Sequence, residues 1–191
     1  MPVNNALIIA VSDDIKASLS LMLSEIGITD ISATSGNSLR ELLSEKSYGL
    51  ILLVMPLENG LGLETARYIS EFTQSALVIF TPSKVYEEVC GKLSSISANI
   101  LPKNTPDCIM KSTIRSALHV KEQLDELRCE NEALRKTVNE MKLVNRAKCV
   151  LIEYLRISEK EAHRQIQKRA MDRRTTLTEV AADIIKTYEY L

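Results

Sequence analysis

A dense group of basic side chains near the C-terminus is the part of this sequence best suited to bind phosphate groups. From Asn145 onward, ten basic residues stand against seven acidic ones. Cations at this density can neutralise the phosphates of a nucleic acid and release its counterions. A basic run is also a common solvated helix face, so charge alone leaves both interpretations open. The richest part contains Arg164, Lys168, Arg169, Arg173 and Arg174.

Three helices are expected to position these cations. Ser158, followed three residues later by Glu161, forms a capping box that predicts the start of one helix. Thr175 or Thr176 is predicted to cap the next, and a third helix precedes Ser158. Each helix has one apolar face, and short helices bury such faces by closing into a bundle. The residues expected to pack within it rather than to contact a ligand are Ala147, Ala162, Met171 and Ala181.

The bulk composition argues against several other functions. The net charge of the chain is −1, so any attraction for nucleic acid must be local. The 4 cysteines include no CxxC pair, which argues against a zinc site or a disulfide framework and favours a reducing cytoplasm. We find no phosphate-binding glycine loop, nucleophile elbow, secretory signal or membrane-length apolar run. We therefore expect no enzymatic activity, no cofactor, no bound metal and no membrane contact.

The first part of the chain, residues 1–115, alternates apolar runs with amphipathic stretches. This alternation predicts a parallel sheet with helices on both faces, and the five runs fit a flavodoxin-like, doubly wound α/β domain. Because the runs are continuous and aliphatic, we expect strands buried on both faces. Sites in such sheets lie at the carboxyl ends of the strands. The predicted strands are Ala6–Val11, Ile28–Ala33, Leu50–Met55, Ala76–Phe80 and Ser97–Leu101, and the predicted helices are Ile15–Ile26, Ser38–Glu45, Leu61–Phe72 and Lys84–Leu93.

The second part of the chain lacks glycine and proline from Asp107 onward, which predicts one continuous helix joining the two halves. Its middle carries an apolar seam of about three heptads. Asn131 at a seam position would fix the register of a parallel two-stranded coil, and Glu130 would pair with Arg135 of the partner subunit. The alternative is a helix packed on its own domain, although its other faces are almost wholly polar. The seam residues expected to form a homodimeric coiled coil are Leu124, Leu127, Asn131, Leu134, Val138 and Met141.

Residues 1–115 resemble the receiver domains of response regulators at four positions. Asp13 and Asp14 follow the first apolar run, Thr81 follows the fourth, and Lys103 follows the fifth. In that family the carboxylates hold Mg²⁺, while the hydroxyl and the lysine bind the phosphoryl group. The resemblance implies a receiver fold in which these residues are either remnants or a residual metal or anion site.

The aspartate that accepts the phosphoryl group in receivers is missing from this sequence. Its position, four residues before Pro56, is occupied by Leu52. Allowing for a deletion would substitute only Leu53 or Val54, and none of the three side chains can be phosphorylated. Phosphotransfer at the usual site is therefore not expected, which makes this an atypical receiver.

The segment NRAKCVLIEYLRISEKEAHRQIQKRAMDRRTTLTEVAADII resembles the ANTAR family of RNA-binding antiterminator domains almost end to end. Matching features include Ala147-Lys148, the Ser158 cap, Ala170-Met171 and Val180-Ala181. ANTAR domains bind a pair of small hairpins in nascent leader transcripts, which keeps an overlapping terminator from forming. The order of receiver, coil and ANTAR domain resembles the amidase-operon type of antiterminator. Together with the local charge, the resemblance implies RNA contacts by Lys148, Lys168, Arg169, Arg173 and Arg174.

These patterns predict a receiver-like domain over 1–115, a coiled-coil helix over 116–145 and an ANTAR domain over 146–191. The leading interpretation is a cytoplasmic, dimeric transcription antitermination regulator that binds tandem RNA hairpins. Its control would come from a regulatory protein partner or a ligand acting on the receiver-like domain. Two alternatives remain, a phosphorylation-dependent response regulator with an unusual acceptor and a protein-interaction scaffold that uses only the coil.

Overall fold

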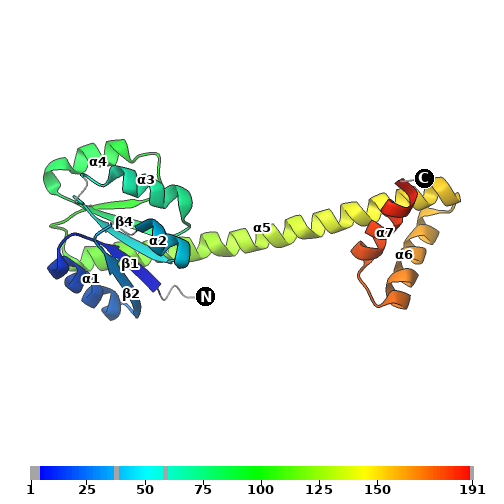
Figure 1. The fold of residues 1–191 in the computed structure, drawn as a ribbon, viewed down its shortest axis with the longest axis horizontal. Coiled ribbons are helices and arrows are strands. Elements are labelled where there is room, and N and C mark those ends of the chain that lie inside the picture. The colour runs from blue at the N-terminus through cyan, green and yellow to red at the C-terminus, as the bar shows by residue number, and fades with distance from the viewer. Residues whose placement is uncertain (1–4, 37–38, 58–59, 190–191) are drawn as a thin grey trace. The chain divides into compact units, whose positions relative to one another are not determined.

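The chain folds into two compact units, Met1–Asp125 and Glu126–Leu191, both of which include part of one long helix (Figure 1). The structure, a computed structural model, describes residues 5–36, 39–57 and 60–189. Helix α5 (Asp107–Leu155) is 49 residues long. The predicted continuous helix is therefore confirmed, because no glycine or proline interrupts the backbone hydrogen bonds.

The first unit is a five-stranded parallel sheet in the order β2-β1-β3-β4-β5. This order confirms the predicted flavodoxin-like, doubly wound fold. Each predicted strand and helix is present, with ends shifted by a few residues; Ser38, the predicted start of one helix, lies outside the described residues. The elements are β1 (Asn5–Ile9), α1 (Asp13–Glu25), β2 (Asp30–Thr34), α2 (Leu39–Glu45), β3 (Leu50–Val54), α3 (Leu63–Phe72), β4 (Ala76–Thr81), a 3-10 turn (Ser83–Val85), α4 (Tyr86–Lys92) and β5 (Asn99–Pro102).

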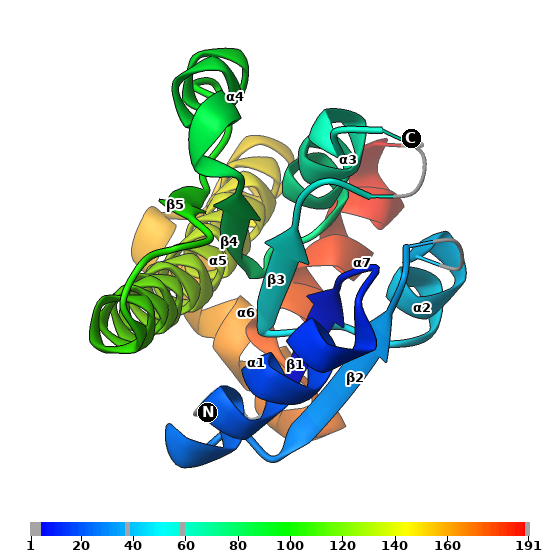
Figure 2. The ribbon, with the colours of Figure 1, turned by 90° about the vertical axis from the view of Figure 1, so that its left-hand side faces the viewer.

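Alternate side chains along the sheet enter two separate cores. The core that contains Ile8 and Leu52 is covered by α1 and by the beginning of α5. The core that contains Ile9 and Leu53 is covered by α2, α3 and α4 (Figure 2). Strand register holds these pairs together, since Ile8 faces Leu52 and Ile9 faces Leu53 across β1 and β3. A single-residue slip would exchange the two cores, so the register is strongly specified.

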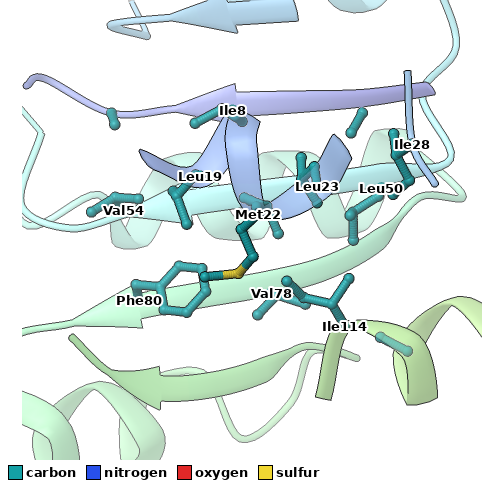
Figure 3. Packing of buried hydrophobic residues seen from close by; sticks show 14 residues of the cluster. Ile8, Leu19, Met22, Leu23, Ile28, Leu50, Val54, Val78, Phe80 and Ile114 are labelled. Atoms are coloured by element: carbon teal, nitrogen blue, oxygen red, sulfur yellow. The ribbon is translucent and has the colours of Figure 1, made fainter. Parts of the chain in front are cut away.

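The core under α1 also anchors the start of α5 to the sheet. Figure 3 shows Met22 of α1 pointing toward the ring of Phe80 on β4, and Ile114 of α5 beside Val78. Ile114 is fully buried and Ala117 nearly so. An ion pair between Lys111 and Glu25 (2.5 Å) joins α5 and α1 at the surface of this core. The first turns of α5 therefore belong to the receiver-like fold.

The expectation that every strand is buried on both faces is wrong for the two edge strands. β1, β3 and β4 are almost wholly buried, whereas the residues of β2 and β5 are exposed or half-buried. Edge strands have a neighbour on one side only, so part of their surface remains in water. Polar residues such as Asp30, Ser32 and Asn99 accordingly lie in these two strands.

The second unit is a three-helix bundle made by the end of α5, α6 (Glu159–Arg173) and α7 (Leu177–Glu189). Small side chains let the helices approach closely, and aliphatic side chains fill the space between them. Burying each leucine or isoleucine contributes about 1.5–3 kcal/mol to the stability of the bundle. Its buried core consists of Ala147, Leu151, Ala162, Ile166, Ala170, Val180, Ala181, Ile184 and Ile185.

Both predicted helix starts in the bundle are observed. Ser158 Oγ accepts a hydrogen bond from the backbone N–H of Glu161 (3.3 Å), and the Glu161 carboxylate accepts one from the Ser158 backbone N–H (2.9 Å). These hydrogen bonds lower the pKa of the Glu161 carboxyl below its usual value. Thr176, rather than Thr175, caps α7 by accepting a hydrogen bond from the Glu179 N–H (3.2 Å). The capping box thus fixes where the basic helix begins.

The prediction that Met171 packs within the bundle is wrong. Its side chain is 78% exposed, whereas Ala147, Ala162 and Ala181 are fully buried as predicted. Ala170 takes the core position in the last turn of α6, and the next residue along a helix points about 100° away. Met171 therefore lies on the surface of α6, away from the buried face of the helix.

Candidate functional site

The basic cluster of α6 is divided between two sides of the helix. Arg169 and Arg173 lie beside α7, where with Lys186 they border a cavity of about 320 Å³. Lys168 is exposed and precedes Arg169 by one position, so it points to a different side. The basic run of the sequence is thus divided by the helix. Arg169 and Arg173 form a groove group beside α7, and Lys168 belongs to an outer group on another side of α6.

The groove between α6 and α7 contains an acid as well as cations. Arg173 Nη1 donates a hydrogen bond to Asp183 Oδ2 at 3.0 Å, which ties the last turn of α6 to α7. Both side chains remain more than half exposed, so the pair contributes only about 0–1 kcal/mol. Asp183 also lines the cavity and offsets part of its positive charge.

Arg174 ends α6 in a strained backbone conformation. Its φ is 52° and its ψ 44°, the left-handed region, and its backbone N–H bonds to the carbonyls of Ala170 and Met171. A residue with a Cβ pays roughly 1–2 kcal/mol for this conformation. Arg156, which follows α5, has a similar φ of 55°. Both positions carry a cation at a helix C-terminus, where the negative end of the helix dipole favours it.

Lys148 links α5 to α6 inside the bundle. Its side chain is only 16% exposed, and its Nζ lies 2.7 Å from Glu159 Oε1. The hydrogen bond from Lys148 and its positive charge lower the pKa of the Glu159 carboxyl. Lys148 follows Met141 by seven residues, so the heptad spacing of the seam reaches it. Here this side of α5 borders α6, and the contact with Glu159 accounts for a lysine at that position.

Three groups of this surface were missed by the sequence analysis. Lys186 and Asp183 line the groove, and Glu159 is the partner of Lys148. Lys186 follows Asp183 by three positions, which predicts that they share one side of α7. The pairing across helices needs the relative rotation of α5, α6 and α7, which no local sequence pattern specifies.

The receiver-like unit has a shallow cavity of about 320 Å³ at the carboxyl edge of its sheet. Of the four polar residues predicted for this edge, only Lys103 is among its lining residues. Thr81 is fully buried at the end of β4, and the Lys103 backbone N–H donates to its carbonyl at 2.9 Å. The other lining residues are Val11, Ser12, Ile15, Val54, Pro56 and Leu57.

The two predicted acids of this edge lie in the first turn of α1. Asp13 is 94% exposed and its Oδ1 lies 2.8 Å from Lys16 Nζ, a contact that lowers the pKa of the Asp13 carboxyl. Asp14 is also exposed. Among the described residues, no group of three or more histidine, cysteine, aspartate or glutamate side chains is placed to hold a metal ion. The arrangement therefore offers a lysine and apolar walls rather than a cluster of carboxylates.

The position predicted for the missing nucleophile lies within the sheet. Leu52 is in the middle of β3, fully buried and paired with Ile8 and Val78. Val54 ends the strand and lines the cavity. Both side chains are aliphatic, so neither offers an oxygen to accept a phosphoryl group.

The predicted coil seam forms an exposed apolar stripe on α5. Leu124, Leu127, Leu134, Val138 and Met141 are between 46% and 66% exposed. Asn131 is exposed among them. A stripe of this length on one helix face is typical of a surface that meets another protein. No helix in the described part of the chain is long and apolar enough to cross a membrane.

Several solved structures share the receiver-like fold. The receiver domain of a response regulator from Bacteroides fragilis aligns with a TM-score of 0.55 at 17% identity, over 61% of this chain and 97% of its own. A receiver domain protein from Clostridium thermocellum aligns with a TM-score of 0.56 at 18% identity, over 64% and 99%. The response regulator StyR aligns with a TM-score of 0.62 at 12% identity, over 97% and 100%. These likenesses define the fold class, a receiver-like α/β domain followed by helices.

Residues 132–185 match the ANTAR domain. The match begins in the expected coil segment of α5 and includes all of α6 and most of α7. None of the curated proteins matches this chain. The chain thus combines a receiver-like fold with a C-terminal segment that matches the ANTAR domain.

Two substitutions in β3 compare the cost of a carboxylate inside the sheet with its cost beside the cavity. Leu52→Asp places a carboxylate in a fully buried site without a partner, and we expect it to lower the free energy of unfolding by roughly 4 kcal/mol or more. Val54 is also buried (4% exposed) but borders the cavity near Lys103, so Val54→Asp should cost less, about 2–3 kcal/mol. Urea unfolding followed by circular dichroism measures both. Equal losses would show that the cavity beside Val54 gives a carboxylate no better surroundings than the interior of the sheet.

Arg174→Gly should stabilise the second unit, because glycine adopts the left-handed conformation without the Cβ penalty. We expect a gain of about 1 kcal/mol in the free energy of unfolding relative to Arg174→Ala. Both variants lose the same guanidinium group, so their difference isolates the backbone. Urea unfolding of the two variants provides the comparison, and an alanine variant as stable as the glycine variant would contradict it.

Proposed function

We propose that this chain is an RNA-binding regulator of transcription that acts by antitermination. It binds a pair of short hairpins in a nascent leader transcript and thereby keeps an overlapping terminator from forming. The observation that carries the proposal is the ANTAR match over residues 132–185, which coincides with the basic helical bundle. Its mode of action is binding, and it requires no catalytic step.

The distribution of charge supports an RNA contact on α6. Lys168 and Arg174 are exposed and are proposed to contact phosphates directly. Arg169 and Arg173 border the groove, and Lys148 is held by Glu159. An RNA contact by Lys148 or Arg173 would require an exchange of its present carboxylate partner. Tyr154 packs against Tyr188 with ring centroids 5.2 Å apart, which leaves phosphate contacts as the main expected source of affinity.

A homodimer through α5 would provide two such modules for two hairpins. The exposed stripe from Leu124 to Met141 is the proposed interface, with Asn131 fixing a parallel register. Binding of one hairpin would raise the effective concentration of the second module at its own hairpin. Tandem hairpins would then be bound far more tightly than either hairpin alone.

The coil seam and the bundle use different sides of α5. The buried bundle residues Ala147 and Leu151 are rotated by roughly 110° from the continuation of the seam, given 3.6 residues per turn. Packing of α6 and α7 therefore leaves the stripe from Leu124 to Met141 accessible to a second copy, and only beyond it, at Lys148, does this side of α5 border α6. The two interactions are compatible on one helix.

The receiver-like unit is proposed to receive its signal from a regulatory protein partner or a ligand rather than from phosphorylation at the usual strand position. Leu52 and Val54 are aliphatic, and Asp13 and Asp14 do not line the cavity at the sheet edge. In domain order the chain resembles the amidase-operon type of antiterminator, and we place it near that type. Incorporation of one phosphoryl group from a small-molecule donor with Mg²⁺, detected by intact mass, would instead favour a conventional switch.

A selection experiment tests the RNA claim without a known target. The full chain is offered a pool of RNAs with two short hairpins and randomised loops, and a second pool with one hairpin. At moderate salt we expect enrichment from the first pool, with an affinity at least tenfold higher than for the matching single hairpin. Absence of enrichment from both pools would contradict the proposed function, and equal enrichment would contradict the tandem mode.

A matched pair of substitutions tests the coil. Leu134→Lys places a charge in the stripe, whereas Ala133→Lys places the same charge on the neighbouring exposed position outside it. We expect a dimer for the unchanged chain and for Ala133→Lys, and a monomer for Leu134→Lys, because a buried pair of lysines opposes association. Sedimentation equilibrium of the full chain measures the mass. If the unchanged chain sediments as a monomer, the proposed homodimer is wrong.

A further inference from the structure

One side of α6 carries cations without acids between them. Lys160, Arg164 and Lys168 recur every four residues, so they lie in a row about 6 Å apart along the helix axis. All three are exposed. Within the described part of the chain, no ion pair engages them. We call Lys160, Arg164, Lys168 and Met171 the outer row.

Met171 continues the outer row at its C-terminal end. It is the most exposed of the large apolar side chains in the described residues, at 78%. A single exposed apolar residue is common on proteins and needs no explanation by itself. Its position is informative, because it follows Lys168 by three residues and lies on the same side of the helix, next to Asp172, where the four-residue spacing ends. The one aromatic ring of α6, that of His163, is half-buried, so Met171 is the exposed polarisable group on this side.

The other two candidate phosphate sites on α6 are less suitable. The groove beside α7 contains Asp183, and Arg173 is already bound to it at 3.0 Å. The N-terminus of α6 is occupied by its own capping box, and the carboxylates of Glu159 and Glu161 lie in its first turn. Acids at both places repel phosphate, whereas the acids nearest the outer row, Glu161 and Asp172, lie at its two ends, and none lies between Arg164 and Lys168.

From these observations we infer that the RNA strand runs along the outer row of α6, with Lys160, Arg164 and Lys168 on successive phosphates and Met171 against the face of a base or ribose. The inference rests on the proposed RNA binding and specifies which side of the helix performs it. It assigns a contact to Met171, and it gives Arg173 the role of a positioning residue that holds α6 to α7.

Two double variants with the same charge change test this assignment. Arg164→Ala with Lys168→Ala removes two cations from the outer row, and Arg169→Ala with Lys186→Ala removes two from the groove. The affinity of each full-length variant for the hairpin RNA selected by the unchanged chain is measured at several salt concentrations. We expect the outer variant to bind at least tenfold more weakly and to lose about 1.5–2 from the slope of log affinity against log salt. The groove variant should keep the slope of the unchanged chain.

Met171→Ala tests the apolar contact separately from the charges, because it leaves the number of cations unchanged. We expect a threefold to tenfold loss of affinity with an unchanged salt slope, because an apolar contact releases no counterions. Met171→Leu, which restores apolar volume, should recover most of the affinity. Because four of the five altered side chains are exposed and Arg169 is half-buried, far-ultraviolet circular dichroism should show the same helix content in every variant.

The outcomes separate the two proposals. If the unchanged chain selects no RNA, the proposed function fails and the outer row fails with it. A second outcome is that the unchanged chain binds RNA while the slope of log affinity against log salt falls in the groove variant and not in the outer variant. That result would overturn the assignment to the outer row and leave the proposed function standing. Unaltered binding by Met171→Ala would overturn the base contact.

Discussion

The structure depends on the unbroken continuity of α5, whose sides are used differently along its length. Near its start, Ile114 and Ala117 are buried against the sheet of the receiver-like unit. Between Leu124 and Met141 its apolar side chains are exposed in one stripe. Toward its end, Ala147 and Leu151 form the core of the bundle. A proline between Met141 and Ala147 would kink or break the helix between the stripe and the bundle, and none is present.

Much of the fold could be predicted from the sequence because its signals are local or strictly periodic. Aliphatic runs, the Ser158 capping box and the absence of helix breakers after Asp107 each act within a few residues. The error at Met171 has a different origin. Ala170 and Met171 are both apolar neighbours, and which of them is buried depends on the rotation of α6 against α7. The edge positions of β2 and β5 likewise depend on strand order, which no single run encodes.

The candidate sites were predicted less completely, because a site depends on several elements at once. Asp13 and Asp14 follow the first apolar run as the receiver pattern requires, yet α1 begins at Asp13 and carries both acids on its exposed first turn. In α6 a sequence run of basic residues is divided by the helix into a groove group and an outer row. The residue types were therefore predictable, but their convergence was not.

The most direct test of the account is single-round transcription on a template whose leader encodes the selected hairpin pair, with the second hairpin overlapping an intrinsic terminator. Adding the full chain should increase the fraction of full-length transcript in proportion to occupancy of the RNA. A leader with only the first hairpin intact should show no increase. Tight binding to the pair without any change in read-through would contradict antitermination as the function of this protein.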